Sequence, residues 1–203
     1  MQALIEQARS FSSRGGDLSH LAGGQSPEVL FVCCSDSRVV PALMTGARPG
    51  ELFELRTAGG VVPPYRDDWP WGEAAVTIEY AVEVLGVCEV VVCVHSECGA
   101  VSGPPAGERV ESSPAPQDGP VIEPGLPAPP GGPGEPEPQM SLAEREHMLI
   151  QLESLRSYPC VQARLADGRL RVHGWFYEVH TGFVSTRWCG GGVDWDGGEF
   201  VRW

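Results

Sequence analysis

Two short motifs of this sequence contain side chains that commonly bind zinc: Cys34-Ser-Asp-Ser-Arg38 and His95-Ser-Glu-Cys98. Two thiolates and one imidazole are a recognised ligand set for catalytic zinc, with the fourth position left open for water. A metal ion held there would lower the pKa of its bound water towards about 7, which yields a nucleophile for a small electrophile at neutral pH. Cys34, His95 and Cys98 are therefore the candidate metal ligands.

Two charged residues that follow the first cysteine could assist such a site. Asp36 can bind the metal as a fourth ligand or accept a hydrogen bond from the bound water, and the sequence leaves both roles open. Arg38 can pair with Asp36, which keeps the carboxylate ionised and fixes its direction. Gly99, directly after Cys98, would let the backbone approach the metal.

Each of these signals is weak when it is taken alone. A cysteine at a strand end is usually a core residue, a His-x-x-Cys pair arises by chance, and an Asp-x-Arg pair in a loop is usually a surface ion pair. Their combination at the ends of separately predicted strands favours a metal site. Cys33 could compete with Cys34 as a ligand, but alternation along a strand points the two side chains to opposite faces, so only one can serve.

The candidate ligands are expected to meet because they follow strands of one parallel sheet. Apolar runs predict strands at residues 28–34, 51–56 and 89–94, and helical periodicity predicts a helix at 73–85 that ends at Gly86. Strand, helix and strand in this order imply right-handed crossovers and a parallel sheet. Ligands of such sheets bind beyond the carboxyl ends of the strands, where Cys34 and His95 stand.

A segment of different composition interrupts this pattern. Residues 103–139 contain 12 of the 19 prolines, seven glycines, six acidic residues and one base, without helical or strand periodicity. Such a composition predicts a disordered acidic linker or a long surface loop. After it, Ser141 and Glu144 fit the capping box of a helix that ends before Pro159, and residues 169–179 suggest a last strand.

The composition restricts the cellular compartment and the classes of partner that we expect. A net charge of −13 argues against nucleic-acid binding, which needs Lys and Arg to neutralise phosphates. The odd count of seven cysteines fits a disulfide framework poorly, and Cys88 and Cys93 look like small core residues. No stretch approaches the ~20 apolar residues of a membrane span, and the first ten residues lack the pattern of a secretory signal. We therefore expect a cytoplasmic protein with no nucleic-acid or membrane partner.

The fold expected from these elements is a single zinc-binding α/β domain over residues 1–203. Its central sheet should be mostly parallel and flanked by helices.

Further segments around the two motifs follow a known pattern. They are Gln25-Ser-Pro27, Cys34-Ser-Asp-Ser-Arg-Val39, Gly50-Glu-Leu-Phe53, Arg56-Thr-Ala-Gly59, Ile78-Glu-Tyr-Ala-Val82, His95-Ser-Glu-Cys-Gly-Ala100 and His173-Gly-Trp175. Together they resemble the β-class carbonic anhydrases. The resemblance implies reversible hydration of carbon dioxide to bicarbonate and a proton, a lyase reaction. It implies Zn2+ on Cys34, His95 and Cys98, with an Asp36–Arg38 dyad beside the metal as the candidate catalytic pair.

The resemblance also implies partners and a mode of substrate binding. The substrate is a small molecule, and Gln25 and Gly99 are the candidate substrate-binding residues. The protein is expected to form a homodimer or a multiple of dimers, with Gln25 facing the active site near the subunit interface.

The chain departs from the family pattern at three places. Thr57-Ala-Gly-Gly60 stands where the family usually has Asn-Ala-Gly-Asn, Val94 replaces a usual glycine, and the Pro-rich residues 103–139 replace helices. Two alternatives therefore stay open: a hydrolase of carbon disulfide or carbonyl sulfide on the same scaffold, and a zinc-binding regulatory homologue without catalysis. No proton relay could be named, because the four remaining histidines are expected to be structural or exposed; these are His20, His147, His173 and His180.

Overall fold

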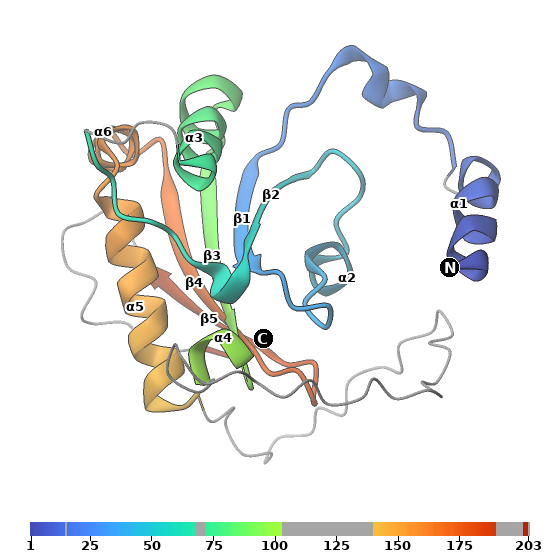
Figure 1. Ribbon diagram of the computed structural model, residues 1–203. Helices are drawn as coiled ribbons and strands as arrows, with labels where there is room; N and C mark the ends of the chain where they lie inside the picture. The colour runs from blue at the N-terminus through green and yellow to red at the C-terminus, as the bar shows by residue number, and fades with distance from the viewer. Residues whose placement is uncertain (15, 68–71, 103–139, 190–200, 203) are drawn as a thin grey trace.

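The computed structural model describes residues 1–14, 16–67, 72–102, 140–189 and 201–202 (Figure 1). The predicted disordered linker at 103–139 lies outside the described residues, and so do residues 190–200 and 203. No helix in these described ranges is both long and apolar enough to cross a membrane.

A mixed sheet forms the centre of the fold. In the described residues it has six strands in the order β2-β1-β3-β4-β5-β6. Their bounds are β1 Val29–Cys34, β2 Leu52–Thr57, β3 Glu89–His95, β4 Arg171–Tyr177, β5 Val184–Cys189 and β6 Val201–Arg202. The first four run parallel, whereas β5 and β6 are antiparallel to their neighbours. The expected α/β architecture with a mostly parallel sheet is therefore confirmed.

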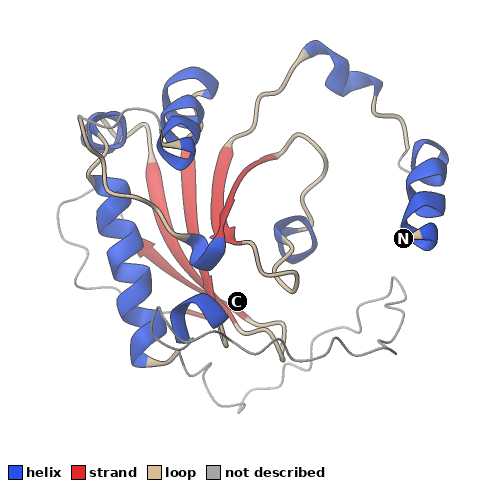
Figure 2. Ribbon diagram, in the orientation of Figure 1, coloured by secondary structure: helices blue, strands red, loops and turns tan. Residues whose placement is uncertain are grey.

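Helices cover one face of this sheet more completely than the other (Figure 2). On the covered face lie α3 (Glu73–Glu79), α5 (Leu142–Arg156) and α6 (Pro159–Ala166), and their apolar residues join the strands in the larger core cluster. The opposite face has a smaller cluster around Phe31, with Met44 of the short helix α2 (Pro41–Thr45) packed against it. Burial on both faces explains why β1 and β3 read as continuous apolar runs.

The glycine and the capping box that predicted the ends of two helices have these roles in the structure. The predicted helix at 73–85 is α3 continued by a π-helical turn, η3 (Tyr80–Leu85), and it stops at Gly86 in the left-handed region with φ +70°. Gly86 tolerates this conformation because it has no Cβ. Helix α5 starts with the predicted capping box: Ser141 Oγ accepts from the Glu144 amide, and Glu144 accepts from the Ser141 amide.

Helix α5 approaches β4 closely at one glycine. A Cβ built on Gly174 would lie 2.8 Å from the sulfur of Met148 and 3.5 Å from a methyl group of Leu152. Both side chains are buried, so they have little room to move aside. The absence of a side chain at Gly174 thus sets the distance between the helix layer and the sheet.

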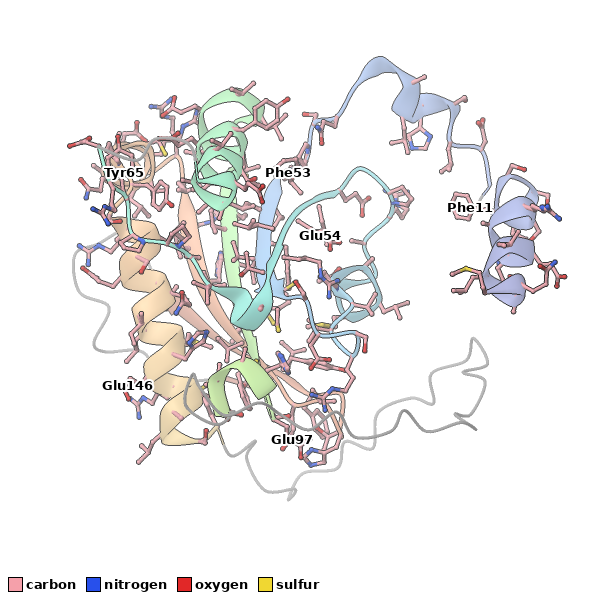
Figure 3. The ribbon with its side chains drawn as sticks, in the orientation of Figure 1. Phe11, Phe53, Glu54, Tyr65, Glu97 and Glu146 are labelled. Atoms are coloured by element: carbon pink, nitrogen blue, oxygen red, sulfur yellow. The ribbon has the colours of Figure 1, made fainter. Side chains whose placement is uncertain are left out.

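Helix α1 (Gln2–Arg14) stands apart from the sheet (Figure 1). None of its residues is buried, and its apolar residues Leu4, Ile5 and Phe11 are exposed. Phe11 is labelled in Figure 3. The remaining short elements are η1 (Ser19–Gly23), η2 (Ala58–Gly60) and α4 (Gly99–Ser102).

Two sequence-based expectations about the fold were wrong. The strand predicted at 169–179 is β4, but it is not the last strand, because β5 and β6 follow it. Cys88 is exposed rather than a core residue, since it lies in the loop just before β3 begins at Glu89. Its neighbour in the prediction, Cys93, is buried inside β3 as expected.

Candidate metal centre

The three candidate ligands converge at the carboxyl ends of two adjacent strands. Cys34 is the last residue of β1, His95 is the last residue of β3, and Cys98 lies in the loop that leaves β3. One ligand atom from each lies within 4.8 Å of the others, and all three residues are buried. The two Sγ atoms are 3.9 Å apart. Two zinc–sulfur bonds of about 2.3 Å at a tetrahedral angle place the sulfurs about 3.8 Å apart, so the spacing suits one zinc ion.

Cys33 is excluded from this group by its position on the strand. Its side chain packs in the smaller core cluster with Phe31 and Cys93, on the opposite face of the sheet. Burial raises the pKa of the Cys33 thiol to about 12, so the neutral thiol is favoured there. The alternation expected for a strand therefore leaves Cys34 as the cysteine that meets His95 and Cys98.

The imidazole of His95 is arranged as a metal ligand would be. Its Nδ1 lies 2.9 Å from the carbonyl oxygen of Ser96, which can only accept, so Nδ1 carries the hydrogen. Its Nε2 is buried and has no hydrogen-bond partner. Burial lowers the pKa of His95, which favours the neutral ring with a lone pair on Nε2. A buried nitrogen of this kind costs free energy unless a partner binds it, and a metal ion fits that need.

The two cysteines lie in different local surroundings. Cys34 Sγ accepts backbone hydrogen bonds from Gly59 at 3.2 Å and from Asp36 at 3.4 Å. Burial raises the pKa of Cys98, partly offset by the amides of Ala100 and Val101. A bound cation would stabilise both thiolates, since metal binding deprotonates a coordinating thiol.

Asp36 and Arg38 form a charged pair beside the ligands. The Arg38 backbone amide and Nε donate to Asp36 Oδ1 at 2.9 and 3.0 Å, and Nη2 donates to Oδ2 at 2.8 Å. The hydrogen bonds from Arg38 lower the pKa of Asp36 to about 2. Asp36 Oδ2 lies 3.9 Å from His95 Nε2, close to where a fourth ligand would stand. The pair thus holds an ionised carboxylate next to the candidate metal position.

Two buried or half-buried side chains hold the ligand loops, and sequence reasoning gave neither of them this role. Arg56 Nη2 donates to three carbonyl oxygens of the loop after β1, those of Cys34, Asp36 and Val39. The buried carboxylate of Glu144 accepts from the backbone amide of Glu97 at 3.0 Å as well as from its own capping box. The capping signal identified Glu144 as a helix residue, but nothing local in the sequence indicated that it would reach the ligand loop.

The two candidate substrate-binding residues lie in different places: Gln25 is away from the three candidate ligands, and Gly99 is next to Cys98. Gln25 is exposed and precedes β1, so it lies at the amino ends of the strands, beside a cavity of about 550 Å³ lined in part by Gly50 and Tyr80. Gly99 begins α4 directly after Cys98, but a Cβ there would meet no protein atom within 4 Å. Protein packing therefore gives no reason for a glycine at position 99.

Comparisons with known proteins agree with this geometry. A family model described as "Carbonic anhydrase" matches residues 29–184. A curated carbonic anhydrase from Pseudomonas aeruginosa is 38% identical over 183 residues, which is 89% of this chain and 82% of that protein. The solved structure of the β-carbonic anhydrase CcaA matches with a TM-score of 0.70 and 28% identity, over 100% of this chain and 91% of that one. A structure from a report on two tetrameric β-carbonic anhydrases of Sordaria macrospora matches with a TM-score of 0.62, over 91% of this chain and 92% of that one, but at 23% identity it speaks for the fold alone.

Proposed function

The chain belongs to the β-carbonic anhydrase family of lyases, and we propose that it hydrates carbon dioxide reversibly to bicarbonate and a proton with a zinc ion on Cys34, His95 and Cys98. The observation that carries the proposal is the convergence of these three side chains, with a buried His95 Nε2 that has no other partner. Hydration of carbon dioxide is the general activity of the family. The charge and spacing of the three donors fit zinc.

Some residues of the site would bind the metal ion, and others would orient the attacking water. When bound, zinc would lower the pKa of a coordinated water and so supply a nucleophile near neutral pH. Burial lowers the pKa of His95 and so favours the neutral ring, and its Nδ1–H bond to Ser96 leaves Nε2 available near the cysteines. The amides of Gly59 and Asp36 stabilise the sulfur of Cys34.

Asp36 is proposed to orient the attacking water. Its carboxylate is ionised because Arg38 binds both oxygens, so it can accept a hydrogen bond and cannot donate one. Arg38 is itself held by the carbonyl oxygen of Glu97 at 3.1 Å, within the ligand loop. If Asp36 instead occupied the fourth metal position, Arg38 would have to draw it away, and activity would rise steeply with pH as water replaced the carboxylate.

We also propose that the working enzyme is a homodimer or a multiple of dimers. Gln25 lies at the far end of β1 from Cys34, so it can act at an active site only if that site belongs to another subunit. The apolar residues of α1 that no part of the described chain covers offer surface for such an association.

The test of the proposed function is stopped-flow hydration of carbon dioxide by protein whose zinc content has been measured. We expect activity that scales with zinc content and disappears on chelation. Rates with carbonyl sulfide and carbon disulfide, measured on the same preparation, separate the lyase from a hydrolase. Zinc-loaded protein that is inactive on all three substrates would contradict the proposal and leave a regulatory zinc protein.

A further inference from the structure

The turn after β2 connects the candidate metal centre to helix α5 through a single residue, Gly59. Its amide donates to Cys34 Sγ at 3.2 Å, and its carbonyl oxygen accepts from His147 Nε2 at 2.7 Å. The two groups belong to successive peptide planes that share the Gly59 Cα. The orientation of one plane therefore depends on how the other is held.

Glycine by itself does not hold this turn. Gly59 has φ +75° and the next residue, Gly60, has φ +67°, both in the left-handed region. A glycine is required at position 59, because a Cβ there would lie 3.3 Å from the Cβ of Ala100 on a backbone that other residues rarely adopt. Glycine, however, populates positive and negative φ about equally, so the adopted conformation must be selected by an outside contact.

His147 is itself fixed, and its bonding assigns its tautomer. A carbonyl oxygen only accepts, so Nε2 carries the hydrogen that binds Gly59. Nδ1 is then an acceptor, and the amide nitrogen of Gln151 lies 3.4 Å from it. Gln151 is buried, and its amide oxygen accepts from the backbone of Val62 at 2.8 Å, in the same loop that follows the glycines.

We propose that His147 is a positioning residue that sets the hydrogen bond from Gly59 to the metal-binding sulfur of Cys34. The inference rests on the proposed function, because it takes Cys34 to be a zinc ligand. A hydrogen bond to a coordinated thiolate withdraws charge from the sulfur and orients it, and such bonds tune the metal without touching it. Loss of His147 should therefore change the metal–sulfur bond rather than the number of metal ions bound.

The same geometry distinguishes this role from that of a proton relay. A relay histidine must exchange protons with water and buffer through a ring nitrogen. Both nitrogens of His147 already have partners within the protein, one in Gly59 and one in Gln151. A rate lost in a His147 variant should consequently not return when imidazole buffer is added.

The first measurement needs only the parent protein. Two-bond 1H–15N spectra report which ring nitrogen carries the hydrogen, and we expect the Nε2–H tautomer of His147 at neutral pH. An Nδ1–H tautomer would overturn the proposal, since Nε2 could not then donate to Gly59.

The second measurement compares two substitutions of similar size. His147→Leu removes the donor, whereas His147→Gln keeps an amide nitrogen that can reach the Gly59 carbonyl. With leucine we expect faster exchange of the Gly59 amide, a shifted sulfur-to-cobalt charge-transfer band in the Co2+-loaded protein, and a zinc affinity about tenfold lower. With glutamine all three should return towards the parent values. Glu146→Gln, at the neighbouring exposed position of α5, is the matched control and should leave them unchanged (Figure 3).

The outcomes separate this proposal from the proposed function. If the parent bound neither zinc nor cobalt, the proposed function would fail, while the Gly59 amide in the metal-free protein would still test His147. If His147→Leu did not fold, His147→Ala would take its place against His147→Gln. A leucine or alanine variant with the parent's amide exchange and cobalt spectrum, or one rescued by imidazole, would refute the positioning role.

Discussion

The two ends of the parallel strands present the same residue types in different states. At the carboxyl ends stand His95, Asp36 and Arg38, with cysteines close by. At the amino ends stand His173, Glu89 and Arg171, and Cys88 is next to Glu89 in sequence. Each end thus has an imidazole, a carboxylate, a guanidinium and a thiol.

The difference lies in how the histidine is bonded. At the amino ends, Glu89 accepts from His173 Nε2 at 2.7 Å and also from Arg171. At the carboxyl ends, both carboxylate oxygens of Asp36 accept hydrogen bonds from Arg38, and His95 Nε2 is buried without a hydrogen bond. The metal site is therefore indicated by a buried ring nitrogen that has a lone pair and no hydrogen-bond partner, with two thiols close to it. The residue types alone, which occur at both ends, do not indicate a metal site.

The largest expected difference between the two ends of the strands is in the zinc content of variants. We expect about one zinc per chain in the parent protein. Cys34→Ser, His95→Ala and Cys98→Ser should each lose most of it, because every ligand of a three-residue set is needed. Elemental analysis by mass spectrometry measures the content.

The matched controls lie at the other end of the strands. Cys88→Ser and His173→Gln change the same residue types and should keep the parent's zinc. Full zinc occupancy in all three ligand variants would remove the site assignment, and zinc loss in the controls would erase the contrast between the two ends.

A smaller effect is expected when Asp36 is changed: the hydration rate should fall while the zinc stays bound. Asp36→Asn removes the charge that Arg38 holds and should keep the zinc, while the hydration rate falls on the order of tenfold or more, as for a residue that orients a ligand. Glu89→Gln makes the same kind of change at the amino ends and should leave the rate unchanged. An Asp36→Asn protein at the parent rate would make the Asp36–Arg38 pair structural only.

The smallest effect concerns stability against pH at the amino ends. Burial pushes the pKa of Glu89 upwards, but its bonds to Arg171 and His173 outweigh this and leave the pKa below its ordinary value. The ionised carboxylate therefore stabilises the fold fully above the unfolded-chain pKa of about 4.3, and this contribution is lost as the pH falls through the lower, folded value. Because the pair is partly exposed, we expect at most about 1 kcal/mol.

Urea unfolding of the parent and of Glu89→Gln would measure this contribution. The difference in unfolding free energy should shrink as the pH drops below about 4. A difference that stayed constant at low pH would show that the carboxylate charge of Glu89 does not contribute.

Much of the framework could be predicted because it depends on local patterns. The apolar runs of β1 and β3, the glycine stop at Gly86 and the capping box at Ser141 are each contained within a few residues. The meeting of Cys34 with His95 followed from the general rule that the carboxyl ends of parallel strands share one edge.

The contacts that hold the site could not be predicted in this way. The bond from His147 to Gly59 joins residues 88 positions apart, and Glu144 reaches Glu97 across 47 positions. No periodicity or spacing indicates such partners, because the apolar face of α5 restricts its rotation on the sheet but not its position along its own axis. The place of Gln25 at the amino ends follows from its position before the strand predicted at 28–34, but no local pattern indicated what it would contact there.

The close contact at Gly174 extends the set of mutation-sensitive positions beyond the site. Met148 rests on this glycine, and its neighbour along α5 is His147. A methyl group added at position 174 must displace Met148 or raise the helix, and either change would move His147 relative to Gly59. In a library of random variants selected for activity, position 174 would score as intolerant although it has no side chain and touches no ligand. A map of intolerance for this protein would therefore follow the contact between its layers as well as its chemistry.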